Sequence, residues 1–149
     1  IIIACNTATA AAIDWLRLSY PDMLFIGIEP MIKSAAQATK TGVITVCATP
    51  ATLASPHYKR LVERYAPGIT VLEPDCSSWA RLIENNIVHE AHIDKTISDG
   101  LAKNADVIVL GCTHYHWIKD EIVELTKDKA LILEPSEAIG RRVRYLLTR

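Results

Sequence analysis

The sequence predicts an α/β protein with parallel sheets, and two observations carry this prediction. Short runs of Ile, Val and Leu alternate along the whole chain with stretches whose apolar residues recur at helical spacing. Turn and cap signals separate the segments, such as Pro21, Thr41-Gly42 and Pro67-Gly68. Strands interleaved with helices at this spacing are typical of right-handed βαβ units, which build parallel sheets.

The first part of the chain is expected to form strand, helix, strand and helix. Residues 1–4 are a short apolar run, and the alanine-rich stretch after them is helical until Pro21 stops it. Residues 23–28 form the second predicted strand, and Glu29-Pro30 opens the next helix. Two parallel strands with helices between and after them follow from this order.

The rest of the chain continues the alternation. Residues 43–48 are strand-like, and Ser55-Pro56 has the residue types of an N-cap and first helical position. Pro67-Gly68 closes that helix. Further strands are expected at 69–72, 107–110 and 130–133, and further helices around Trp79, Ile97, Ile122 and Val143, the last of them capped by Ser136.

Composition restricts the partners. The chain has 149 residues, 50% of them hydrophobic, so it can bury one substantial core or two small ones. Sixteen basic residues and 17 acidic residues give a net charge of −1, which argues against nucleic acid or anionic lipid as a binding partner. No apolar run approaches the ~18 residues of a membrane span. We therefore expect a cytoplasmic protein with a small-molecule ligand, no nucleic acid and no membrane.

Two of the four cysteines occupy matching positions. Cys5 and Cys112 each end an apolar run, at the edge of a parallel sheet where ligands bind and the next helix presents free N–H groups. Such a helix start favours a thiolate. A lone cysteine there is commonly a small core residue, but polar residues follow both thiols and favour a ligand site. They are Asn6, Thr7, Thr113 and His114, and an N-cap role stays open for the first three.

Other chemistries lack their sequence signals. No Arg stands six positions after Cys5 or Cys112, as a phosphatase loop needs, and no glycine-rich phosphate motif is present. The cysteines form neither a CxxC pair nor a Cys/His cluster, so no metal site is expected. Two proton-transfer groups that face one another suit inversion at a carbon centre. Racemisation is therefore the hypothesis drawn from the residues.

Three segments then point to a family. IIIACNTATA, GVITVCATPAT and VIVLGCTHY, in this order, resemble the glutamate racemases, cofactor-independent enzymes of the Asp/Glu racemase superfamily. The resemblance implies two pseudo-symmetric, doubly wound parallel-sheet domains, the first incomplete here, and no cofactor or metal. It implies that L-glutamate is converted to D-glutamate for peptidoglycan. We expect residues 1–41 in the first domain, 42–129 in the second, and 130–149 in a return to the first.

The resemblance also implies roles for single residues. Cys5 and Cys112 would be the two acid/base thiols, one on each face of the substrate Cα. His114 would tune Cys112 or relay its proton. The residues expected to bind substrate are Asn6, Thr7, Thr49, Thr52 and Thr113, and Glu84 matches a further acidic position only loosely.

This chain departs from the family pattern in three ways. An Asp-Ser-Gly strand and a Pro-Tyr-Gly loop precede the ACNT strand in the family and are absent here, so the 149 residues alone are expected to be nearly inactive. His116 stands where the family usually has proline, and Glu134-Pro135-Ser136 replaces a common Asp-Ser-Gly. Residues expected to be structural or at the surface are Cys47, Cys76, His57, His89 and His92.

Two alternatives remain open at this point. One is a racemase of aspartate or a related small acid, although the histidine after Thr113 favours glutamate. The other is a non-catalytic remnant that binds an acidic ligand or another subunit. The sequence does not decide the oligomeric state, and a homodimer is one expectation.

Overall fold

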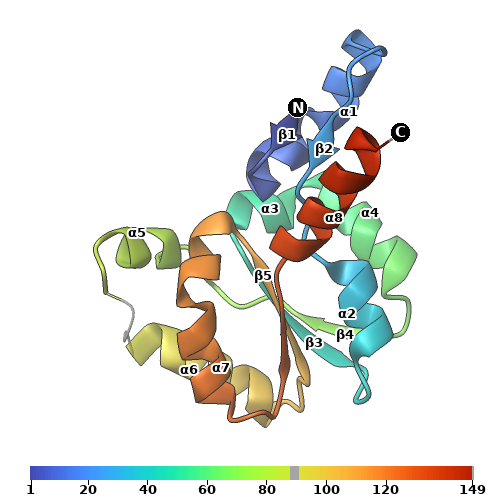
Figure 1. Ribbon diagram of the computed structural model, residues 1–149. Coiled ribbons are helices and arrows are strands. Elements are labelled where there is room, and N and C mark those ends of the chain that lie inside the picture. The colour runs from blue at the N-terminus through green and yellow to red at the C-terminus, as the bar shows by residue number, and fades with distance from the viewer. Residues whose placement is uncertain (88–90, 149) are drawn as a thin grey trace.

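The computed structural model describes residues 1–87 and 91–148, and Figure 1 shows a small lobe above a larger one. The small lobe begins with β1 (Ile2–Ile3), α1 (Asn6–Ser19) and β2 (Ile26–Gly27), whose strands pair in parallel. Both strands are shorter than the sequence predicts. The last helix, α8 (Ser136–Leu147), lies beside this two-stranded sheet. We refer to residues 1–28 with α8 as the small lobe and to the remainder as the large lobe.

The large lobe contains a four-stranded parallel sheet. Its spatial order is β4 (Thr70–Leu72), β3 (Val43–Ala48), β5 (Val107–Gly111) and β6 (Leu131–Leu133). The strand order reverses between β3 and β5, which are hydrogen-bonded over five residue pairs. β6 pairs with β5, although the expected return to the first domain begins just before it. The expected domain boundaries remain a prediction.

Helices cover both faces of this sheet and enclose two cores. On one face α2 (Ile32–Ala38) and α4 (Pro56–Tyr65) pack against residues such as Ile44 and Val109. On the other face lie α5 (Trp79–Glu84), α6 (Ala91–Ala102) and α7 (Lys119–Thr126). The predicted α/β fold with doubly wound parallel strands is therefore confirmed.

Several local details differ from the prediction. A short helix, α3 (Pro50–Ala54), was not predicted, although Thr49 caps it and Pro50 occupies its first turn, as Ser55 and Pro56 do for α4. Ser136 does not cap α8: it is the first helical residue, and its N–H donates to the Glu134 carboxylate at 2.7 Å. A 3₁₀ helix, η1 (Thr113–Ile118), precedes α7.

The residues assigned to structure can now be placed. Cys47 and Cys76 are both buried in the core beneath α5 and α6, as predicted. His57 is half-buried and lies 2.8 Å from the Glu29 carboxylate, and His89 lies outside the described residues. Within residues 1–87 and 91–148, no helix combines the length and the apolar character needed to cross a membrane.

Candidate active site

Cys5 and Cys112 occupy equivalent positions in the two lobes. Cys5 follows β1 and is the residue before α1, with φ −152° and ψ 125°. Cys112 follows β5 and is the residue before η1, with φ −146° and ψ 139°. The cysteines themselves therefore hold the N-cap positions. Asn6 and Thr113 are the first helical residues, so the alternative N-cap role does not apply to them.

The two thiols differ in exposure. Cys5 is exposed, whereas only 9% of Cys112 is accessible. Burial raises the pKa of the Cys112 thiol, and the backbone N–H groups of His114 and Tyr115 partly offset this by stabilising the thiolate. Negative charge on Cys5 would raise the pKa of Cys112 further.

Three threonine hydroxyls join the lobes beside these thiols. The Thr7 Oγ1 atom on α1 lies 2.9 Å from Thr49 Oγ1 and 3.0 Å from Thr52 Oγ1. Thr49 and Thr52 are themselves 3.0 Å apart. Each hydroxyl can donate one hydrogen bond and can also accept hydrogen bonds. The three threonines can therefore offer O–H donors to a bound anion. All three had been predicted to bind substrate, and the fold brings them together.

Asn6 is the buried polar residue of this region. Only 3% of it is accessible, and neither its amide nitrogen nor its amide oxygen has a hydrogen-bond partner among the described residues. An unsatisfied buried amide costs free energy, which a ligand or further structure can recover by hydrogen bonding. Its position next to Cys5 fits the predicted role in ligand binding.

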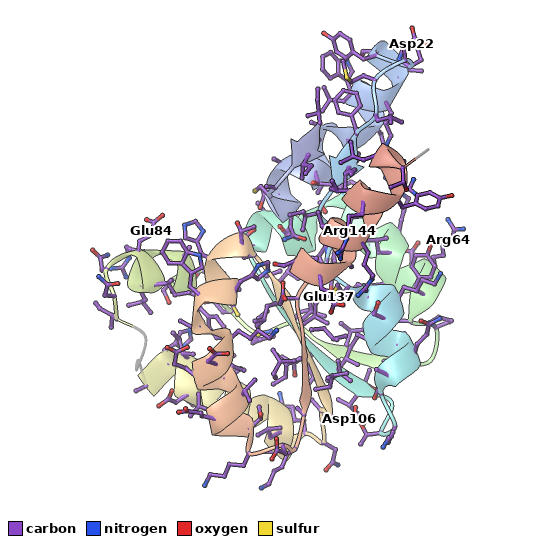
Figure 2. All side chains as sticks on the ribbon, in the orientation of Figure 1. Asp22, Arg64, Glu84, Asp106, Glu137 and Arg144 are labelled. Carbon is purple, nitrogen blue, oxygen red and sulfur yellow. The ribbon has the colours of Figure 1, made fainter. Side chains whose placement is uncertain are left out.

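His114 links Cys112 to a carboxylate. Its Nδ1 lies 3.8 Å from the Cys112 sulfur, and its Nε2 lies 2.7 Å from Glu84 Oε1. Glu84 is on α5, at the outer edge of the large lobe (Figure 2). The sequence pointed to Glu84 only through a loose family match. Its partner is 30 residues away in the chain, so no local pattern could have identified the pair.

The position in the sheet explains why these residues meet. Ligands of open α/β sheets bind beyond the carboxyl ends of the strands, where the strand order reverses. Here that point lies between β3, followed by Thr49, and β5, followed by Cys112. Thr113 is half-buried directly after the thiol. In the described part of the chain, no group of three His, Cys, Asp or Glu side chains could hold a metal ion.

Comparison with known families identifies the fold. The Asp/Glu/hydantoin racemase family matches residues 1–139. The chain belongs to this family. Among curated relatives, glutamate racemase from Pseudomonas syringae pv. tomato is 35% identical over all of this chain and 56% of the relative. That from Herpetosiphon aurantiacus is 38% identical over 99% of this chain and 59% of the relative.

Solved structures agree with this placement in the racemase family. Escherichia coli glutamate racemase, in complex with L-glutamate and the activator UDP-MurNAc-Ala, matches with a TM-score of 0.81 and 27% identity, covering 99% of this chain and 57% of that one. The Francisella tularensis enzyme, in complex with D-glutamate, matches with a TM-score of 0.76 and 28% identity over 99% and 56%. This racemase-family chain therefore spans a little over half the length of the relatives it matches.

Proposed function

We propose that this chain carries the two catalytic thiols of a glutamate racemase that interconverts L- and D-glutamate without a cofactor. The observation that carries the proposal is the pair formed by Cys5 and Cys112, each at a strand end and a helix start, in two lobes that the hydrogen bonds of Thr7 with Thr49 and Thr52 join. The names of the relatives and the L- and D-glutamate complexes of the solved structures support the choice of substrate.

The reaction needs one base and one acid on opposite faces of the substrate. The thiolate of one cysteine removes the proton from Cα, and the electron pair of the broken C–H bond enters the planar, carboxylate-conjugated intermediate. The thiol of the other cysteine returns a proton to the opposite face. Each turnover leaves the two thiols with exchanged protonation states, and proton exchange with solvent restores the starting pair before the same enantiomer reacts again.

The surrounding donors lower the barrier to forming this intermediate. Proton loss from Cα places negative charge on the substrate carboxylate, and fixed donors stabilise such charge. The threonine triangle, the N–H groups at the starts of α1 and η1, and the Asn6 amide are the donors available beside the thiols. We assign substrate binding to Asn6, Thr7, Thr49, Thr52 and Thr113.

His114 and Glu84 serve the thiol of the large lobe in this proposal. Glu84 accepts a hydrogen bond from Nε2 of His114, so the other ring nitrogen faces the Cys112 sulfur as an acceptor, or as a donor when the ring is protonated. His114 can thus take the thiol proton as Cys112 becomes a thiolate. The resemblance further suggests a role in cytoplasmic peptidoglycan synthesis and leaves a homodimer to be tested.

The test compares single cysteine variants of the full-length protein that contains these 149 residues. Cys5→Ser and Cys112→Ser are each expected to abolish glutamate inversion, measured by circular dichroism, because each removes the acid or base from one face. Cys47→Ser is the matched control in the core, and its rate should be limited only by the fraction folded. Full racemisation by either active-site variant would contradict the proposal. Inversion of L-aspartate but not L-glutamate would identify the substrate as wrong.

A further inference from the structure

Glu29 and His57 form a hydrogen bond where the chain crosses between the lobes. Glu29 is the first residue of the linker, residues 29–31, which joins the 1–28 segment of the small lobe to α2. The Nε2 atom of His57 lies 2.8 Å from Oε1 of Glu29. An ionised carboxylate can only accept hydrogen bonds, so the imidazole N–H is the donor. Only 13% of the His57 side chain is accessible, so this bond is largely shielded from water.

The backbone next to Glu29 is fixed to the small lobe. Ile28, the residue before Glu29, is buried. Its N–H donates to Thr9 Oγ1 on α1 at 3.1 Å and to the Ile3 carbonyl at 3.2 Å. The Thr9 hydroxyl itself donates to the Ile3 carbonyl at 3.3 Å. The segment that leads into the linker is therefore held by β1 and α1, the two elements that flank Cys5.

His57 belongs to the part of the large lobe that carries two of the site threonines. It is the second residue of α4, and the N-cap of α4, Ser55, is also the residue that ends α3. The Ser55 hydroxyl donates to the Thr52 carbonyl at 2.7 Å. Thr49 caps the other end of α3. The bond from His57 to Glu29 therefore connects the small lobe to the corner between α3 and α4, close to Thr49 and Thr52.

The linker also lies beside the carboxyl ends of the two central strands. Ala48 and Gly111 are paired there as the last residues of β3 and β5, and Cys112 follows Gly111. A Cβ at Gly111 would lie 3.5 Å from Pro30 Cγ, so the ring of Pro30 lies against this strand end. The position of the linker therefore sets where the small lobe lies over the strand ends at which the candidate site is built.

We propose that His57 is a positioning residue for the candidate active site. By binding Glu29, it holds the small lobe in the orientation in which the threonine hydroxyls of the two lobes meet. The ion pair of Arg60 with Asp14 also joins the lobes, but its side chains are 59% and 71% exposed, and exposed pairs contribute little. The importance of this orientation for catalysis rests on the proposed function, whereas the orientation itself does not.

Disulfide trapping measures how readily the lobes adopt this orientation. Thr7→Cys and Thr52→Cys are introduced together into the full-length protein that contains these 149 residues, with Cys5 and Cys112 replaced by Ser so that they do not compete. The hydroxyls that the new sulfurs replace are 3.0 Å apart, so oxidised glutathione should join the sulfurs. His57→Phe keeps a ring but removes the donor. The disulfide should then form about threefold to tenfold more slowly, the range expected for the loss of one hydrogen bond.

Further variants separate positioning from general damage. His57→Gln places an amide N–H near the position of the imidazole N–H and should restore most of the trapping rate. Arg60→Gln removes the exposed ion pair one turn further along α4 and should leave the rate unchanged. Glu29→Met removes the acceptor, so it should slow trapping as His57→Phe does, and it provides the test if His57→Phe does not fold.

Peptide mass mapping gives the rate at which the disulfide forms in each protein. An unchanged rate in a folded His57→Phe or Glu29→Met protein would overturn the proposal, as would an equal loss with Arg60→Gln. Because no turnover is measured, a failed racemase assignment would leave these results intact.

Discussion

The two lobes place the same strand–Cys–helix unit in different surroundings. In the large lobe, helices cover both faces of the sheet, and Cys112 lies at the edge of a closed core. In the small lobe the sheet has two strands, and nine of the fourteen large apolar side chains that are exposed in the described residues belong to it. Cys5 is accordingly exposed. The burial of a thiol is thus decided by what packs over its strand, whatever residues surround it in the sequence.

The largest expected difference is in stability, between truncating a core residue of the large lobe and truncating a strand residue of the small lobe. Ile108 on β5 is fully buried, so Ile108→Ala should lower the free energy of unfolding by about 2–5 kcal/mol through lost burial and a cavity. Ile2 on β1 is 47% exposed, and Ile2→Ala should cost less than about 1 kcal/mol. Chemical denaturation of both variants measures the difference. Equal losses would show that the lobes are equally well packed.

Two helical glycines sharpen the comparison. A Cβ at Gly100 on α6 would lie 2.7 Å from Thr45 Oγ1, on a stiff side chain of a central strand, so Gly100→Ala should destabilise by about 1–3 kcal/mol. A Cβ at Gly140 on α8 would meet no described atom within 4 Å. Gly140→Ala should therefore stabilise by about 0.5–1 kcal/mol through helix propensity. Thermal denaturation distinguishes the expected destabilisation by Gly100→Ala from the expected stabilisation by Gly140→Ala. Destabilisation by both variants would mean that Gly140 is packed against a neighbouring element.

Asp106 tests how the turn between α2 and β3 is held in the large lobe. Burial acts to raise its pKa, but hydrogen bonds from Thr39, Lys40 and Thr41 outweigh this and lower it. A lowered pKa stabilises the fold above the ordinary pKa of aspartate, and this stabilisation is lost as the pH falls through the folded-state pKa. Asp106→Asn should thus cost about 1–2 kcal/mol at neutral pH.

The loss of unfolding free energy caused by Asp106→Asn should be smaller in acid, where the wild-type carboxyl is also neutral. Urea denaturation of the wild type and of Asp106→Asn at neutral and acidic pH measures this loss. A difference between variant and wild type that stays constant with pH would argue against an ionised, hydrogen-bonded Asp106.

The reactivities of the two thiols can be compared directly. At neutral pH, Cys5 should be alkylated about tenfold faster than Cys112, because Cys112 is nearly buried and burial raises its pKa. Raising the pH should speed alkylation of Cys112 by increasing its thiolate fraction, although its burial should still keep it slower than Cys5. Peptide mapping after brief treatment with iodoacetamide gives both rates, and a faster Cys112 would reverse the assignment of the two environments.

Local signals predicted the elements best where they were strongest. The alternation of apolar runs and helical periods predicted β3, β5, α1 and α4, because buried parallel strands and capped helices leave distinct patterns. The prediction missed α3, whose five residues are too few to show a period. It overextended β1 and β2, because an apolar run marks residues that can form a strand but not the length over which a partner pairs with them.

The candidate site was predictable in its parts but not in its connections. The sequence pointed to Cys5, Cys112, Thr7 and Thr113 because a thiol followed by polar residues at a strand end is visible in it, whereas Thr49 and Thr52 were expected only from the resemblance to the glutamate racemases. The contacts of His114 with Glu84 and of His116 with Glu134 join residues 30 and 18 positions apart, on different elements. No local pattern encodes such contacts, since they arise only when helices pack around the sheet.

The sequence alone determined the fold class, the two thiols and the polar residues beside them, because periodicity, caps and short motifs depend on neighbouring positions in the chain. Only the tertiary structure decided which thiol is buried, which hydroxyls meet and which carboxylates reach the two histidines of η1. Those properties depend on the order of strands in the sheet and on the helices that cover it, and both are set by packing between residues far apart in the chain.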